Sequence, residues 1–192
     1  MKSTQGHLGK KITDGAYETM IQRITDNQNP DFFFMNYSTE ASVVKDLILI
    51  PKHFFLPEII EKRKPLAPTA RRAGWVGCNI LLDKVPAQGR IPIITDGAVM
   101  DRNSVVRQVN RTAGLETKNL NARGWLIDIL KCTERLKTEQ FLLHDLYFFE
   151  GELQQKHPDN HNIRPKIRQQ LQVLRDKGFI EFLGNGAYRK VN

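Results

Sequence analysis

The side chains best suited to bind a polyanion lie near the end of the chain. Four apolar residues, Ile163, Ile167, Leu171 and Leu174, recur at helical spacing. The cationic and amide side chains between them project to the other side, and they are Arg164, Lys166, Arg168, Gln169, Gln172 and Arg175. Arginine and glutamine match the hydrogen-bonding edges of guanine and adenine, and lysine or arginine pairs with phosphate. The pattern predicts a helix that packs with one face and contacts DNA with the other.

A tight hairpin is predicted directly after this helix. Gly178 ends the helix, and alternating apolar residues then indicate a strand. A Gly-Asn-Gly run at 184–186 tolerates positive φ, as a hairpin turn requires, and Arg189 and Lys190 follow on the return strand. Helix followed by hairpin is the order of a winged helix. The alternative is an ordinary amphipathic helix with a solvated basic face, since such helices are common.

The residues before this helix favour the winged helix. Apolar residues recur at helical intervals over 123–136 and again over 141–153, which predicts two more helices. Three helices and a hairpin are enough for one small DNA-binding domain. We place that domain at residues 119–192.

The loop over residues 61–79 carries a second concentration of positive charge. Its cations are Lys62, Arg63, Lys64, Arg71 and Arg72, and prolines between them favour an extended chain. Such a loop suits a phosphate backbone, and Arg71 and Arg72 are candidate DNA contacts. Trp75 lies between two glycines, where it could stack on a base or wedge beside one. The alternative for Trp75 is a place in the core beside Val76.

The remainder of the chain is typical of a mixed fold with a central sheet. A helix is predicted over 14–24, with Thr13 or Asp14 as its cap, and another over about 103–111. Short apolar runs at 32–35 and 47–50 are expected to be strands covered on both faces, and further strands are expected at 80–82 and 91–94. The predicted fold class is α+β.

Composition bounds the class of protein. The 192 residues carry a formal charge of +8 that is shared by both halves, which favours polyanionic partners. Cys78 and Cys132 stand alone, so we expect ordinary buried thiols in a reducing compartment. With no apolar stretch long enough for a membrane span or a signal peptide, the prediction is a cytoplasmic protein. Phosphate-binding loops, metal-binding histidine pairs and nucleophile motifs are missing, and His144, His157 and His161 are expected at the surface.

Several longer segments together resemble the Dam-replacing protein family. They are TDGAYETM, NPDFFFMNY, RKPLAPTARRAGWVGCNI, Gly89-Arg90, ARGW and KIRQQLQVLRDKGFIEFLGNGAYRK. The resemblance covers nearly the whole chain. It implies a PD-(D/E)xK restriction-endonuclease domain, here residues 1–118, followed by the winged helix. It also implies a monomeric type II enzyme that cuts both strands of double-stranded DNA at GATC with methylated adenines, in a bacterial cytoplasm.

The resemblance also implies a metal-dependent catalytic centre. Family nucleases use an aspartate and a Glu-x-Lys motif, in which the acids hold magnesium and the lysine lies beside the attacked phosphate. They also carry four cysteines that bind zinc. In this sequence Lys2 falls on the motif lysine, so the aspartate, the glutamate and the cysteines are expected to precede residue 1. We therefore expect neither metal to bind these 192 residues, and no unaided cleavage, since a lysine without carboxylates does not fix magnesium.

Two explanations stay open for this departure from the family pattern. Either the protein continues upstream of Met1, or it is a short product that binds DNA without cutting it. A non-catalytic binder of methylated DNA, or a transcriptional regulator, is the alternative to a nuclease.

Recognition of the methyl mark is expected in the major groove. The methyl groups of the two modified adenines project there from adjacent base pairs, so one helix can contact both. We assign this contact to residues 162–172, with Arg164 and Arg168 on guanine edges and Gln169 on adenine or phosphate. Lys166, Arg175 and the two wing cations are expected on phosphates.

Overall fold

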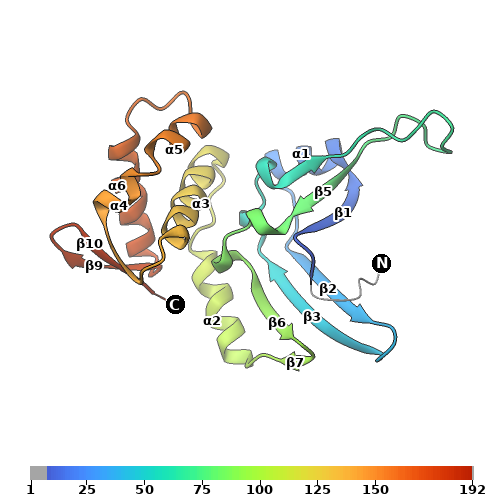
Figure 1. The fold of residues 1–192 in the computed structure, drawn as a ribbon, viewed down its shortest axis with the longest axis horizontal. Helices are drawn as coiled ribbons and strands as arrows, with labels where there is room; N and C mark the ends of the chain where they lie inside the picture. Colours follow the sequence, from blue (N-terminus) through green and yellow to red (C-terminus); the bar gives the residue numbers. More distant parts are fainter. Residues whose placement is uncertain (1–7, 192) are drawn as a thin grey trace. The chain divides into compact units, whose positions relative to one another are not determined.

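The computed structural model describes residues 8–191, which divide into two compact units, one that ends at Ala113 and one that begins at Gly114 (Figure 1). Each unit combines helices with antiparallel sheet. The α+β class predicted from the sequence is therefore confirmed.

The first unit contains two antiparallel sheets. One has the order β1-β5-β4 and the other the order β2-β3-β6-β7. The strands are β1 (Lys11–Ala16), β2 (Phe32–Ser38), β3 (Val43–Ile50), β4 (Ile60–Lys62), β5 (Gly77–Leu81), β6 (Ile91–Thr95) and β7 (Ala98–Val99). The helices are α1 (Tyr17–Thr25) and α2 (Arg102–Ala113), and α2 matches the predicted helix.

The predicted helix over 14–24 is wrong at its start. Residues Lys11–Ala16 form β1, whose Asp14 pairs with Cys78 of β5, so neither Thr13 nor Asp14 caps a helix. The helix begins only at Tyr17. The strand's partner is distant in sequence, and a local pattern does not reveal such pairing.

The first apolar run is not covered on both faces, in contrast to the prediction. It forms β2, an edge strand whose residues alternate between buried and exposed. Phe34 is buried, whereas Phe33 is 61% exposed. The core of this unit instead includes Ile50 of β3, Ile80 of β5 and Ile91 of β6, which are fully buried.

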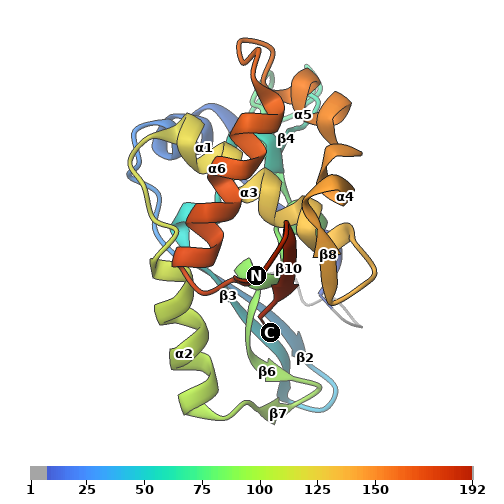
Figure 2. The same ribbon diagram turned by 90° about the vertical axis from the view of Figure 1, so that its left-hand side faces the viewer.

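The second unit packs four helices with a three-stranded sheet. Its elements are α3 (Leu120–Arg135), β8 (Gln140–Leu142), α4 (Leu143–Tyr147), α5 (Glu150–Lys156), α6 (Ile163–Asp176), β9 (Ile180–Gly184) and β10 (Ala187–Lys190). Helix α6 packs against α3, α4 and α5, and Figure 2 shows it running beside α3. The side chains of Ile167, Leu171 and Leu174 on α6 are fully buried in this core. No helix within residues 8–191 is long and apolar enough to cross a membrane.

The predicted helix over 141–153 is three elements rather than one. Its first residues form β8, which pairs with β10 and places Phe141 opposite Tyr188. The two rings stack with centroids 5.5 Å apart, and both are buried. The aromatic pair stabilises a strand here, in a segment whose spacing alone fits a helix.

The helix and hairpin predicted at the end of the chain are confirmed. Helix α6 ends before Gly178, which has φ 73°, and β9 and β10 form an antiparallel hairpin. The turn residues Gly184, Asn185 and Gly186 all have positive φ, as their types predict. The order of α6 and hairpin is that of a winged helix.

Candidate nucleic-acid interface

Helix α6 presents one continuous polar face to solvent. Its first residue, Ile163, and the apolar positions at helical intervals after it are buried. Five of the predicted contact residues are exposed on the outer side, and they are Arg164, Arg168, Gln169, Gln172 and Arg175. The structure therefore brings the predicted base-reading and phosphate-binding side chains together on one helix face.

Two side chains from outside α6 hold its first two arginines. The Arg164 guanidinium lies over the Tyr147 ring, 4.9 Å from the centroid, and its Nε donates to Glu150 Oε2 at 2.8 Å. Arg168 Nη1 donates to the Tyr147 hydroxyl at 3.0 Å. Sequence reasoning missed Tyr147 and Glu150, because they lie on α4 and α5 and no local spacing relates them to α6.

The other two α6 cations each have a polar partner on α6 itself. Lys166 is half-buried, donates to Gln169 Oε1 at 2.7 Å, and lies 5.9 Å from the centroid of the Trp125 ring. Arg175 pairs with its neighbour Asp176 at 2.9 Å. Of these two cations, Arg175 is the more accessible to a phosphate.

The two wing cations lie at the base of the wing, away from its turn. Arg189 pairs with Glu181 across the hairpin at 3.2 Å. Lys190 donates to the Leu136 carbonyl at the end of α3 and is half-buried. The tip of the wing instead consists of Gly184, Asn185 and Gly186, with Leu183 beside it.

Arg71 and Arg72 lie on an arm between β4 and β5 that extends away from the strands (Figure 1). The Leu66 N–H donates to the Trp75 carbonyl and the Leu66 carbonyl accepts from the Gly74 N–H, which closes the arm into a loop. Both arginines are exposed. Arg72 lies over the half-buried Trp75 ring, 5.7 Å from the centroid, so this tryptophan is neither a core residue nor a free probe.

Close packing holds Trp75 against the backbone of Gly77. A Cβ atom at residue 77 would lie 2.9 Å from the Trp75 ring, which is closer than real contacts allow. Glycine is therefore required for this ring position. The arm and α6 belong to different units, and each presents arginine to solvent.

A buried charge cluster lies between α3 and the end of α5. Asp128 is 4% exposed, and its carboxylate accepts from Lys156 Nζ and contacts His157 Nε2 at 3.0 Å. His157 stacks on Trp125 with ring centroids 3.8 Å apart. The prediction of a surface histidine is therefore wrong for His157, because an aromatic ring and a carboxylate that the spacing does not reveal both hold it.

Next to this cluster, a polar cavity of about 430 Å³ opens beside the start of α6. Lys156, His157, His161 and Asn162 are among its lining residues.

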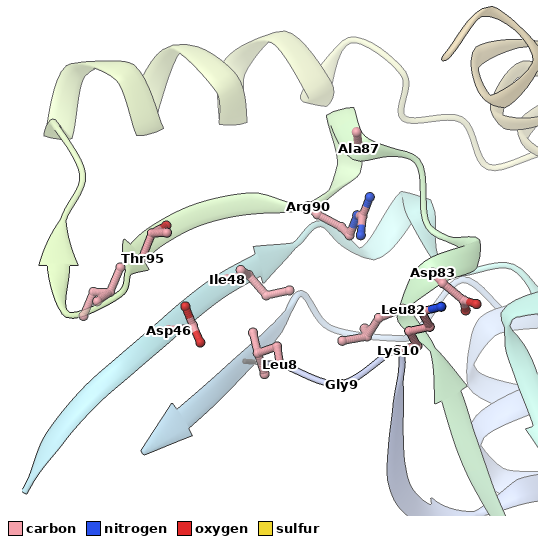
Figure 3. A pocket seen from close by; sticks show the side chains of 11 residues that line it. Leu8, Gly9, Lys10, Asp46, Ile48, Leu82, Asp83, Ala87, Arg90 and Thr95 are labelled. Atoms are coloured by element: carbon pink, nitrogen blue, oxygen red, sulfur yellow. The ribbon is translucent and has the colours of Figure 1, made fainter. Parts of the chain in front are cut away.

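A second cavity of about 410 Å³ lies in the first unit (Figure 3). Asp46, Asp83, Lys10 and Arg90 are among the residues around it. The Asp46 carboxylate is already bound by the Asn36 amide at 3.2 Å and by the backbone N–H of Asp96 at 3.4 Å. Two acids beside two cations do not make a metal site.

Comparison with known families places both parts of the chain in one family. A model described as the Dam-replacing family matches residues 1–118, and a model described as the Dam-replacing HTH domain matches residues 121–190. The chain belongs to the Dam-replacing family. Its two matched domains are those of a DpnI-like restriction endonuclease with a helix-turn-helix DNA-binding domain. The winged helix built around α6 corresponds to that DNA-binding domain.

The metal centre expected of a Dam-replacing nuclease does not fit the described residues. Within residues 8–191, no group of three or more histidine, cysteine or acidic side chains could hold a metal ion. Lys2, the candidate catalytic residue, lies outside the described residues. Cys78 and Cys132 are buried free thiols, as predicted, and burial raises the pKa of Cys132 to about 12.

Proposed function

We propose that this chain recognises adenine-methylated GATC in double-stranded DNA through the exposed face of α6. The observation that carries the proposal is the set of five exposed arginine and glutamine side chains on the helix of the matched DNA-binding domain. A helix fits the major groove, where the methyl groups of both adenines are accessible. Apolar contact with those methyl groups would distinguish methylated from unmethylated adenine, and arginine side chains would bind the neighbouring guanines.

The roles of the side chains follow from their exposure. Arg164 and Arg168 suit guanine edges because each reaches solvent from the first turns of α6. Gln169 suits adenine or a phosphate, and Arg175 suits a phosphate. The arm arginines Arg71 and Arg72 support the proposal independently, since they offer charge to a DNA backbone from the other unit.

For cleavage, we propose that the 192-residue chain binds without cutting unaided. The family resemblance ties hydrolysis to magnesium held by acidic side chains, and residues 8–191 offer no such set. Lys2 would contribute only when paired with those acids. We propose likewise that these 192 residues bind no zinc, and that the chain binds DNA as a monomer.

Binding is tested with gel shifts of the full chain on two short duplexes that differ only in adenine methylation of one GATC site. The expected result is tighter binding to the methylated duplex, about tenfold or more. Equal affinity for the two duplexes would overturn the proposed reading of the methyl groups.

Side-chain roles are tested with substitutions on α6. R168A is expected to reduce methylated-site affinity by about tenfold, whereas R175A should weaken both duplexes equally and reduce the salt slope by about one. R135A on α3 removes the same charge away from the α6 face and serves as the control. If R168A and R135A have the same effect, α6 does not read the site.

Catalysis is tested by incubating methylated and unmethylated plasmids with magnesium and either the 192-residue chain or a version extended upstream in frame. We expect no cleavage by the 192-residue chain, and cleavage of the methylated plasmid by the extended form would show that the protein continues upstream. Cleavage by the 192-residue chain would contradict the assignment of a binding-only role. If the 192-residue chain binds the methylated duplex and neither protein cuts the methylated plasmid, the result supports the second candidate, a non-catalytic binder of methylated DNA.

A further inference from the structure

We propose that Tyr147 and Glu150 are positioning residues that hold Arg164 and Arg168 of α6 in the geometry needed to bind DNA. The proposal rests on the function assigned to α6 above. It concerns two residues that no motif of the sequence singles out. We call these four side chains the arginine tether.

The tether fixes each arginine through only part of its guanidinium group. Glu150 accepts from the Nε–H of Arg164 at 2.8 Å, and the Tyr147 hydroxyl accepts from Nη1 of Arg168 at 3.0 Å. A guanidinium has five N–H donors in a rigid planar fork. The terminal nitrogens of Arg164 and the second edge of Arg168 thus keep donors suited to two-point contact with guanine or phosphate.

The Tyr147 ring links the two arginines. The Arg164 guanidinium lies over one face of the ring at 4.9 Å from its centroid, while the hydroxyl of the same ring binds Arg168. Positions 164 and 168 are one helical turn apart, so both side chains would otherwise sample many rotamers over the same surface. One ring therefore restricts two flexible cations at once, which reduces the entropy lost when DNA binds.

The scaffold beneath Tyr147 is itself well fixed. Helix α4 starts directly after β8, and the Asp145 carboxylate accepts from the Leu142 N–H at 2.8 Å. The next backbone N–H, of Leu143, donates to the Gly186 carbonyl in the wing turn at 2.8 Å. Leu146 is fully buried against the core. The position of the Tyr147 ring is thus set by the wing sheet and by the core together.

Glu150 also lowers the charge that Arg164 presents. Its side chain is 38% exposed, and that of Arg164 is 57% exposed, so the pair is accessible to solvent and contributes little to folding. Next to a DNA backbone, however, the carboxylate opposes attachment of Arg164 to any phosphate. The tether therefore favours a DNA site whose acceptors match the remaining N–H donors of Arg164 and Arg168, and it disfavours binding to phosphates at other sites.

An equivalent group on α3 provides a matched control. Arg135 pairs with Glu152 at 2.6 Å and lies over the Phe149 ring, 4.5 Å from its centroid. The ion pair and the ring contact resemble those of Arg164 in the arginine tether, and Glu152 lies on the same short helix as Glu150. Arg135, however, is not on α6, so loss of its carboxylate partner should leave DNA recognition unchanged.

The test measures binding of the full chain to the methylated duplex and to an unrelated duplex of the same length, over a range of salt concentrations. Y147F retains the ring and removes only the hydroxyl, and it should weaken methylated-site binding by about three- to tenfold with unrelated binding unchanged. E150Q should strengthen unrelated binding and steepen its salt slope, and E152Q should do neither. Thermal unfolding should be the same for all three variants.

A double-mutant cycle separates positioning from a general structural effect. If Tyr147 acts through Arg168, Y147F has no further effect on affinity once Arg168 is replaced by alanine. Equal losses from Y147F in both backgrounds would overturn the proposal, as would wild-type affinities for Y147F and E150Q. If R164A and R168A themselves leave binding unchanged, the function assigned to α6 fails instead, and the two failures are thereby distinguished.

Discussion

At the scale of single residues, the most consequential buried group is the Asp128 carboxylate. It accepts from Lys156 and contacts His157 while its side chain is only 5% exposed. The substitution D128N should lower the free energy of unfolding by about 2–3 kcal/mol, because it leaves two donors facing an amide instead of a charge. Denaturant unfolding measures this loss. E152Q, which breaks an exposed pair, should cost less than about 0.5 kcal/mol, and equal costs would contradict the importance of burial.

The thiol of Cys132 predicts how the stability of the second unit depends on pH. Desolvation by burial, aided by Glu152 and Asp128, raises its pKa from 9.0 to about 12. A raised pKa means that the unfolded chain loses this proton first, so the contribution to stability is complete below pH 9 and declines as the pH rises toward 12. The effect is measured by comparing the free energy of unfolding of C132A with that of the parent protein between pH 9 and pH 12. A parallel decline in both proteins would show that other groups cause it.

At the scale of elements, the backbone conformation at a glycine decides whether alanine can replace it. Gly178 follows α6 with φ 73°, so G178A should cost about 1 kcal/mol and disturb the entry into β9. Gly151 lies in α5, and an added Cβ would contact nothing within 4 Å. We therefore expect G151A to stabilise the protein by about 0.5 kcal/mol. Unfolding curves of the two variants should shift in opposite directions.

The elements also show what the sequence could and could not predict. Helix α6 and its hairpin were predictable because turn glycines and an apolar stripe are local signals. Local spacing predicts helix for residues 14–16 of β1 and 141–142 of β8, because each strand is specified by a partner far along the chain, β5 or β10. The α6 face followed from helical spacing, whereas Tyr147 and Glu150 enter the site through tertiary packing alone. His157 was misplaced for the same reason, because Trp125 and Asp128 lie on another helix.

At the scale of the whole molecule, the two units carry one buried cysteine each, Cys78 in the first and Cys132 in the second. Each thiol therefore reports the unfolding of its own unit. We expect both to resist alkylation at pH 8 in native buffer, since burial raises the pKa of both thiols. Pulsed labelling across a urea gradient, read by mass spectrometry of C78A and C132A, gives a separate midpoint for each unit. Coincident midpoints in every condition would show that the units unfold as one.

The central position of β10 in the wing sheet determines when the DNA-binding unit matures. Strand β8 precedes α6 in the chain, yet its partner β10 follows α6. While the chain is being synthesised, β8 and the aromatic pair of Phe141 and Tyr188 must wait until residues 187–190 have left the ribosome. A nascent or prematurely released chain that ends before Ala187 has α6 but no wing sheet beneath Tyr147. The wing sheet of the DNA-binding unit is thus completed only when these four residues pair with β8 and β9.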